Sequence, residues 1–240
     1  MPQPSGLTFK RLDVYQMANQ LVAPKVSAVK IGSSNAGVGH ADYTVPVGSG
    51  DQLKTVPVGS PNEIIITFTE AVTVNKNHLS VVGADSGTTY NVNSSTFVND
   101  TATKTAKWTF ASPFPADQLV ITLDDGVIDT AVTANALDGE WSNPASLSTS
   151  GSDTFPSGNG TAGGDFIFRV TILPGDVTRN NVVDINDLNT VVNNQGLTPA
   201  VWTQGEMTGD NVVNLSDKNL VNNNFGRNYT SWPGGGQMML

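Results

Sequence analysis

The chain has 240 residues, no cysteine, and a formal charge of −9 from 12 basic and 21 acidic side chains. This acidic balance, without any cluster of Lys or Arg, disfavours nucleic acid as a partner, and no apolar run reaches the roughly 18 residues of a membrane-spanning helix. The lack of cysteine excludes thiol catalysis, disulfide bonds and zinc–thiolate sites.

Residues 1–23 are predicted to form an N-terminal arm. Its apolar side chains follow no clean period, and it lacks the apolar segment of a secretory signal, so we expect a signal already removed or export by another route. Three interpretations of the arm remain open. It packs on the domain that follows, it docks on another subunit by adding a strand to a sheet edge there, or it is an unused tail.

Residues 24–173, called the β-domain, alternate apolar and polar residues as half-buried strands do. In Asn62–Glu70, for example, Ile64, Ile66 and Phe68 share one face. Further strands are expected at Lys104–Ala111, Gln118–Leu123 and Asp165–Ile172, and weaker ones at Lys25–Ile31, Tyr43–Val47, Leu53–Val58, Leu79–Val82, Thr88–Val92 and Val127–Asp129. This pattern predicts a mainly β fold, an antiparallel β-sandwich. Residues 143–164, rich in Ser, Gly, Thr and Pro, are expected to be a flexible connector.

Two stretches of the β-domain carry a family pattern, PNEIIITFTEAV at 61–72 and ALDGE at 136–140. They resemble a bacterial immunoglobulin-like module of secreted surface proteins. The resemblance covers about residues 24–173 and implies an immunoglobulin-like sandwich that acts as a spacer or binding unit. It brings no catalytic residues with it.

Residues 174–228, called the C-terminal module, contain an internal repeat at an offset of 30 residues. The segment DVTRNNVVDINDLNTVVNNQG at 176–196 aligns with EMTGDNVVNLSDKNLVNNNFG at 206–226, and 10 of the 21 aligned positions are identical. Such a repeat indicates two copies of one small structural unit.

Each repeat places oxygen-bearing side chains at positions 1, 3, 5, 9 and 12 of a 12-residue segment, with a backbone carbonyl at position 7. Calcium takes six to eight oxygen ligands, and a loop surrounds it when alternate residues point inward. The predicted ligands are Asp176, Thr178, Asn180, the Val182 carbonyl, Asp184 and Asp187 in the first loop, and Glu206, Thr208, Asp210, the Val212 carbonyl, Asn214 and Asp217 in the second. Position 6 needs a sharp turn and is Asn181 or Asn211, and Asn tolerates a positive φ. The alternative is a degenerate repeat that folds without metal.

A short helix is predicted after each loop. Apolar residues at helical spacing are Ile185, Leu188, Val191 and Val192 in the first repeat, and Leu215, Leu220, Val221 and Phe225 in the second. Gly196 and Gly226 suit the C′ position that ends a helix. Neither helix is long enough to be stable alone, so we expect the two units to bury one shared stripe, with calcium supplying folding energy.

The paired loop–helix repeat resembles a type I dockerin over about residues 174–227. The resemblance implies two calcium ions, one per repeat, held by the ligands named above, and docking on a β-sandwich partner, a cohesin. The chain departs from the family at position 3, which is Thr in both loops, and at position 1 of the second loop, which is Glu206. The helix-start pairs, often Ser-Thr in the family, are Ile185–Asn186 and Leu215–Ser216 here.

Other polar and aromatic residues are assigned to structure rather than to chemistry. His40 and His78 are expected in or near turns, and the acidic pair Asp124–Asp125 in a β-turn. Trp141 is expected to pack in the core or a loop, with stacking on a sugar as the alternative. Trp202 is expected to pack between the repeats.

These patterns together predict a non-enzymatic, extracellular, calcium-binding structural or adhesion protein at the surface of a bacterium. Its module would dock on a β-sandwich, either of another copy, giving head-to-tail self-assembly into a filament or layer, or of a separate cohesin-like scaffold. A carbohydrate-binding module with exposed aromatics near Trp141 and Tyr90 is the alternative from another class. Residues 229–240 are predicted to be a C-terminal tail.

Overall fold

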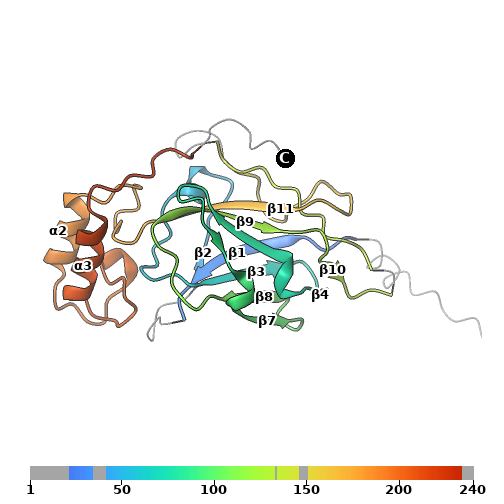
Figure 1. Ribbon diagram of the computed structural model, residues 1–240, viewed down its shortest axis with the longest axis horizontal. Helices are drawn as coiled ribbons and strands as arrows, with labels where there is room; N and C mark the ends of the chain where they lie inside the picture. Colours follow the sequence, from blue (N-terminus) through green and yellow to red (C-terminus); the bar gives the residue numbers. More distant parts are fainter. Residues whose placement is uncertain (1–21, 35–41, 133, 146–150, 234–240) are drawn as a thin grey trace, which may run out of the picture.

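Two antiparallel sheets build the β-domain (Figure 1). The computed structural model describes residues 22–34, 42–132, 134–145 and 151–233. The first sheet has the strand order β2–β1–β3–β8–β7, the second β11–β9–β5–β6, and β10 pairs with β4 alone. The strands are β1 (Val26–Gly32), β2 (Tyr43–Thr44), β3 (Glu63–Phe68), β4 (Val72–Thr73), β5 (Leu79–Gly83), β6 (Thr89–Tyr90), β7 (Thr96–Asp100), β8 (Thr105–Thr109), β9 (Asp117–Leu123), β10 (Ile128–Asp129) and β11 (Phe166–Ile172). The predicted mainly β, antiparallel fold is confirmed.

Alternate residues of both sheets meet in one core. Ile64, Ile66 and Trp108 point inward from the first sheet, and Ile121 and Phe168 from the second. All five side chains are 0% exposed and belong to a single buried cluster. The period of two that predicted the strands therefore also identifies the side chains that hold the two sheets together.

One predicted strand needs correction, and two strands of the structure, β4 and β7, were not predicted. Leu53–Val58 is not a strand, because a short 3-10 helix, η1 (Gly50–Leu53), ends there and only an isolated parallel bridge joins Thr55 to Thr171. Conversely, β7 was not predicted, because its sequence TFVND has no apolar alternation, although it pairs with β8 along its full length. The other short helices are η2 (Lys76–His78), η3 (Val92–Ser94) and η4 (Trp202–Gln204).

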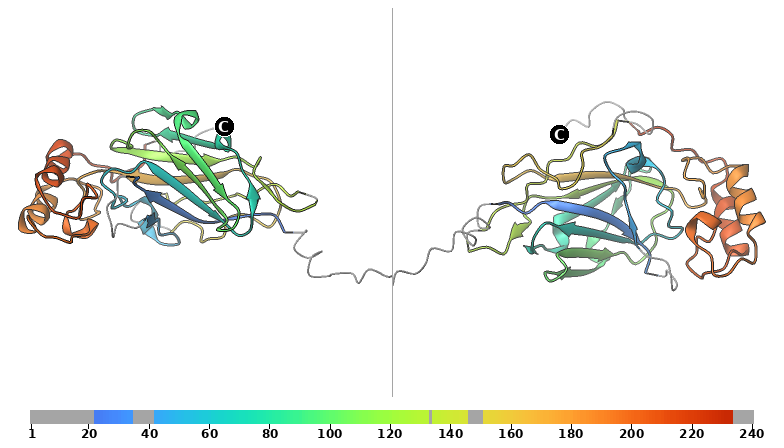
Figure 2. Two further views of the ribbon diagram at one scale, coloured as in Figure 1. Left: turned by 90° about the horizontal axis from the view of Figure 1, so that it is seen from below. Right: turned by 180° about the vertical axis from the view of Figure 1, so that it is seen from behind.

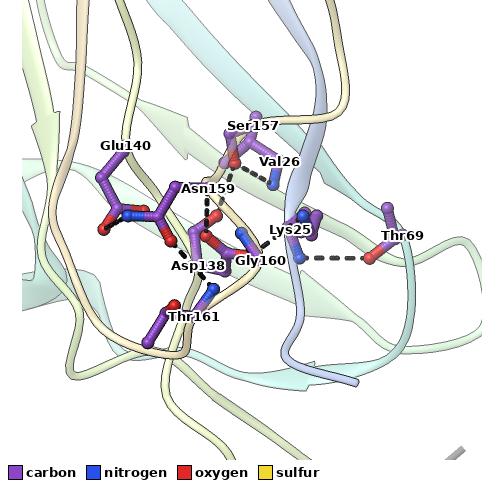
Figure 3. A network of polar contacts seen from close by, with 9 residues as sticks. All are labelled: Lys25, Val26, Thr69, Asp138, Glu140, Ser157, Asn159, Gly160 and Thr161. Atoms are coloured by element: carbon purple, nitrogen blue, oxygen red, sulfur yellow. Dashed lines mark hydrogen bonds and ion pairs between the residues drawn. The ribbon is translucent and has the colours of Figure 1, made fainter.

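A buried carboxylate ties the start of β1 to the segment that was expected to be a flexible connector (Figure 3). Asp138 is 1% exposed, and its Oδ2 lies 2.9 Å from the Lys25 Nζ. The backbone N–H of Asn159 donates to Asp138 Oδ1 at 2.7 Å and that of Gly160 to Oδ2 at 2.9 Å. The side chain of Asn159 donates to Glu140 as well. The described part of residues 143–164 is therefore anchored here rather than loose.

Replacement of Asp138 by Asn is expected to destabilise the β-domain at neutral pH by about 1–3 kcal/mol, because buried donors lose their acceptor. Burial opposes ionisation of this carboxyl group, but the hydrogen bonds from Lys25 and Asn159 outweigh it and lower the pKa of Asp138. A lowered folded-state pKa adds stability above the unfolded-state pKa of about 3.9, and this stability is lost as the pH falls through the folded-state value.

Urea unfolding of wild type and Asp138→Asn at pH 7 and at about pH 3 checks this, because the gap between them should shrink in acid. A gap of equal size at both pH values would contradict the assignment.

The C-terminal module lies at one end of the β-domain, and both views of Figure 2 show its helices there. Its two helices, α2 (Ile185–Asn193) and α3 (Leu215–Asn224), begin 30 residues apart and pack against each other. Its core takes three pairs of equivalent residues from the two repeats, Val177 with Met207, Val183 with Val213, and Val191 with Val221. No helix in the described ranges is long and apolar enough to cross a membrane.

The first residues after the module return to the β-domain, and Figure 1 shows this red segment leaving α3 and running back over the sheets. The Tyr229 hydroxyl lies 3.1 Å from Asp85 Oδ2 and 3.0 Å from the Ala116 carbonyl oxygen, and its one proton can be donated to either acceptor. Trp232 is 9% exposed and lies under the Arg169 guanidinium, 5.2 Å from its ring centroid. Residues 229–233 are thus a packed strap, whereas residues 234–240 lie outside the described part of the chain.

Candidate metal centre

Hydrogen bonds relate the two loops by an approximate two-fold symmetry. The Gly226 N–H donates to the Val183 carbonyl at 2.8 Å, and the Gly196 N–H donates to the Val213 carbonyl at 2.8 Å. In the opposite direction, the Val183 N–H donates to the Arg227 carbonyl at 3.0 Å, and the Val213 N–H donates to the Leu197 carbonyl at 3.1 Å. Position 8 of each loop therefore pairs with the chain that follows the other repeat's helix.

Position 6 adopts the predicted backbone conformation in both loops. Asn181 has φ 65° and Asn211 has φ 67°, in the left-handed region that Asn tolerates better than most residues. Gly226, with φ 84°, directly follows the last residue capping α3, while Gly196, with φ 86°, lies one residue further from the end of α2. The turn prediction is confirmed, and the C′ prediction holds for Gly226 only.

The second loop gathers three carboxylates around one point. One oxygen each from Glu206, Asp210 and Asp217 lies within 4.8 Å of the other two. Ligands of one calcium ion, bound at about 2.3–2.6 Å, are at most about 5 Å apart. Among the described residues, these are the one group of three such side chains placed in this way. The spacing suits a single divalent cation, whose charge would offset the repulsion between the three groups.

Hydrogen bonds from the loop hold the two buried members of this group. Asp217 is 0% exposed and accepts the N–H groups of Met207 at 2.7 Å, Thr208 at 3.1 Å and Asn214 at 2.8 Å. Glu206 is also 0% exposed, and its Oε1 accepts from the Gly209 N–H at 2.6 Å and from the Thr208 hydroxyl at 3.1 Å. The extra methylene of Glu206 thus still permits the contacts expected at position 1.

The first loop has the same framework with fewer carboxylates at its centre. Asp176 is 3% exposed and accepts the N–H groups of Asn180 at 3.1 Å and Asn181 at 2.7 Å. Asp187 is 0% exposed and accepts the Thr178 N–H and hydroxyl, both at 2.9 Å. Asn180 supplies an amide oxygen at position 5, which already accepts the Val182 N–H at 2.8 Å.

Position 9 serves the helices rather than the centre of the loops. Asp184 Oδ1 accepts the Asn186 N–H at 2.7 Å, and Asn214 Oδ1 accepts the Ser216 N–H at 2.7 Å, so both residues cap the helix that follows. The Asn214 amide nitrogen instead points at two other predicted ligands, donating to Asp210 Oδ2 at 2.7 Å and to the Val212 carbonyl at 3.1 Å. Direct ligation by Asp184 and Asn214 is therefore not what this geometry favours, and a water bridge is common at this position.

Charge and burial make the loops receptive to a cation. Desolvation by burial raises the pKa of Asp176, and the nearby charge of Asp187 raises it further, against hydrogen bonds from Thr55 and Asn181 that lower it. Backbone N–H donors satisfy hydrogen bonds but cannot neutralise a buried carboxylate. A bound divalent cation would do so in each loop.

The predicted helical stripes are only partly buried. Val191 and Val221 are 1% and 0% exposed, as expected. The outer members face solvent instead, since Ile185 is 53%, Val192 44%, Leu215 63% and Phe225 52% exposed. Helices this short turn few residues inward. The shared core is therefore completed by the residues at loop positions 2 and 8, which are Val177, Val183, Met207 and Val213.

The remaining predictions divide between packing roles and positions outside the described part. Trp141 stacks on Phe155 with ring centroids 4.6 Å apart inside an aromatic cluster, which supports the packing interpretation. Asp124 accepts the Gly126 N–H in the predicted turn. Trp202 was expected to pack between the repeats. It instead lines a small cavity between the C-terminal module and the β-domain. The N-terminal arm up to residue 21 and His40 lie outside the described residues.

Models of known protein families do not match this sequence, and a comparison with curated proteins finds no match either.

Proposed function

We propose that the C-terminal module binds two calcium ions, one in each 12-residue loop. The observation that carries this is the carboxylate group of Glu206, Asp210 and Asp217, whose oxygens have the mutual spacing of ligands around one ion. The symmetric hydrogen bonds of the two loops support a second, equivalent site in the first loop. The ligands in the first loop would be Asp176, Asp187, Thr178, Asn180 and the Val182 carbonyl, as in a dockerin-like, EF-hand-like loop.

The same proposal assigns the whole chain a structural role outside the cell, at the surface of a bacterium, without an enzymatic activity. Two antiparallel sheets around one core support an immunoglobulin-like β-sandwich as the spacer. Millimolar extracellular calcium would fill about half or more of such loops, because extracellular calcium modules bind with dissociation constants of about 10⁻⁴–10⁻³ M.

The outer faces of α2 and α3 are the docking surface in this proposal. Ile185 and Leu215 occupy equivalent first positions of the two helices and are exposed by 53% and 63%. The loops, in contrast, face the β-domain of their own chain, so a partner has access to the helices rather than to the first loop. The partner is a β-sandwich, either that of another copy or that of a separate scaffold.

Calorimetric titration of the full chain with calcium tests the binding proposal. Two ions per chain are expected, and Asp210→Asn should weaken the second site while leaving the fold intact. Asn is compatible with position 5, because Asn180 makes in the first loop the bond to position 7 that Asp210 makes in the second. Titration with magnesium provides the control, and no calcium heat in wild type would overturn the proposal.

Light scattering in millimolar calcium and then in excess chelator tests the docking proposal. A large species that dissociates on chelation indicates self-assembly, and a monomer in both conditions directs the search to a foreign β-sandwich. Replacement of Ile185 and Leu215 by Asp should abolish either association, and association unchanged by that double replacement would exclude the helix face.

A further inference from the structure

The first loop is in direct contact with the β-domain through the side chain of Asn181. This side chain is 0% exposed, and its Oδ1 accepts the Thr55 N–H at 2.8 Å and the Thr55 hydroxyl at 3.3 Å. Its Nδ2 donates to the Leu53 carbonyl at 2.7 Å and to the Tyr229 carbonyl at 3.2 Å. One side chain at the turn of the loop thus joins the β-domain, the module and the C-terminal strap.

Thr55 is linked through Asn181 to the first predicted calcium ligand. Thr55 is 1% exposed and lies beside β11 through its bridge to Thr171. The backbone N–H of Asn181, whose side chain Thr55 holds, donates to Asp176 Oδ2 at 2.7 Å. A residue 121 positions earlier in the chain therefore supports the carboxylate at position 1 through one intervening residue.

Arg179, at position 4 of the first loop, also turns toward the β-domain. Its Nε donates to the Thr55 carbonyl at 2.8 Å, and its guanidinium lies 4.9 Å from the centroid of the Tyr43 ring. The positive charge of Arg179, which lies within the first loop, therefore contacts the β-domain. Loop conformation and docking share the same residues.

The second loop lacks this arrangement at its equivalent position. Asn211 has nearly the same φ as Asn181. Its backbone carbonyl accepts the Ala200 N–H, a bond that stays inside the C-terminal module. The second loop approaches the β-domain at Met207, since a Cβ on Gly59 would lie 2.0 Å from the Met207 carbonyl oxygen and 2.5 Å from the Met207 Cβ. The two loops therefore share a sequence pattern, but the first is held by side-chain hydrogen bonds to the β-domain at position 6, and the second is held at that position from within the C-terminal module.

We propose that the β-domain is part of the first calcium site: Thr55 and Asn181 are positioning residues that hold the first loop ready for the ion. Residues behind the direct ligands commonly change metal affinity by about 10–100-fold. Because linkage is reciprocal, calcium in the first loop must then strengthen docking of the module on the β-domain by the same factor. The second loop binds without this coupling. The inference rests on the proposed calcium function and adds its regulation by the neighbouring domain.

Asn181→Gly, with Asn211→Gly as the matched control, tests the inference. Glycine adopts the required positive φ without strain, so each replacement removes only the amide side chain. In calorimetry, Asn181→Gly should weaken one of the two calcium sites about tenfold or more, whereas Asn211→Gly should leave both near wild type. Thr55→Val, which keeps the volume and removes only the hydroxyl, should weaken the same site to a smaller extent.

Amide hydrogen exchange of Thr55, followed by NMR in the full chain, provides a readout in a residue that binds no ion. Calcium should slow this exchange in wild type and in Asn211→Gly, and should lose its effect in Asn181→Gly. The inference would be overturned if Asn181→Gly bound two calcium ions as tightly as wild type. It would also be overturned if wild type bound two ions but calcium did not change the exchange rate of the Thr55 amide. Either result would leave the calcium function standing. No binding in wild type would overturn both.

Discussion

Removal of calcium with excess chelator is expected to lower the melting temperature of the C-terminal module by on the order of 10 °C. Four carboxylates, Asp176, Asp187, Glu206 and Asp217, are at most 3% exposed, and N–H donors alone leave their charge uncompensated. A ligand that binds only the folded state at a tenfold excess over its dissociation constant adds about 1.4 kcal/mol, so two such sites add about 2.8 kcal/mol. The measurement is far-ultraviolet circular dichroism at the wavelength of the helical signal.

Magnesium at the same concentration and ionic strength is the control for this experiment. Magnesium demands a tighter octahedral shell than these loops offer, so it should restore little of the lost stability. Equal melting temperatures in calcium and in chelator would contradict a structural role for the ion.

Replacement of Asp217 by Ala is expected to destabilise the module by at least about 3 kcal/mol even in chelator, since three backbone N–H groups lose their acceptor at about 1–3 kcal/mol each. Those donors belong to Met207, Thr208 and Asn214, and the carboxylate that accepts them is 0% exposed. Denaturant unfolding followed by the helical signal measures the change in the free energy of unfolding.

Asp217→Asn separates the two roles of this residue. Its amide oxygen can still accept the bonds from Met207 and Thr208, so most of the folding energy should remain, while the loss of charge should weaken calcium binding. If Asp217→Ala unfolded no more easily than Asp217→Asn in chelator, the carboxylate would not organise the loop as described.

The repeat and the conformation of its loops could be predicted because both depend on local sequence. Alternating oxygen-bearing residues and an Asn at position 6 predict inward-facing ligands and a positive φ, and Asn181 and Asn211 adopt that φ. The strands with clear apolar alternation, such as β3 and β11, follow from the same kind of local rule. A period of two determines which residues face the core.

What the sequence did not predict depends on contacts between distant segments. The bond from Thr55 to Asn181 spans 126 residues and leaves no local pattern in either segment. The same contact explains why Leu53–Val58 is not a strand, because its backbone turns to meet the first loop and β11. Likewise, Tyr229 and Trp232 lie in a polar, glycine-containing stretch that resembles a tail until their partners on the β-domain are known.

A crystal structure of the protein grown in calcium, with the ions located by their anomalous scattering, tests the central claim most directly. The account predicts two peaks, one among Glu206, Asp210 and Asp217 and one between Asp176 and Asp187, each about 2.3–2.6 Å from its oxygen ligands. Loops with no peak at either place, or with ions bound only elsewhere, would contradict it.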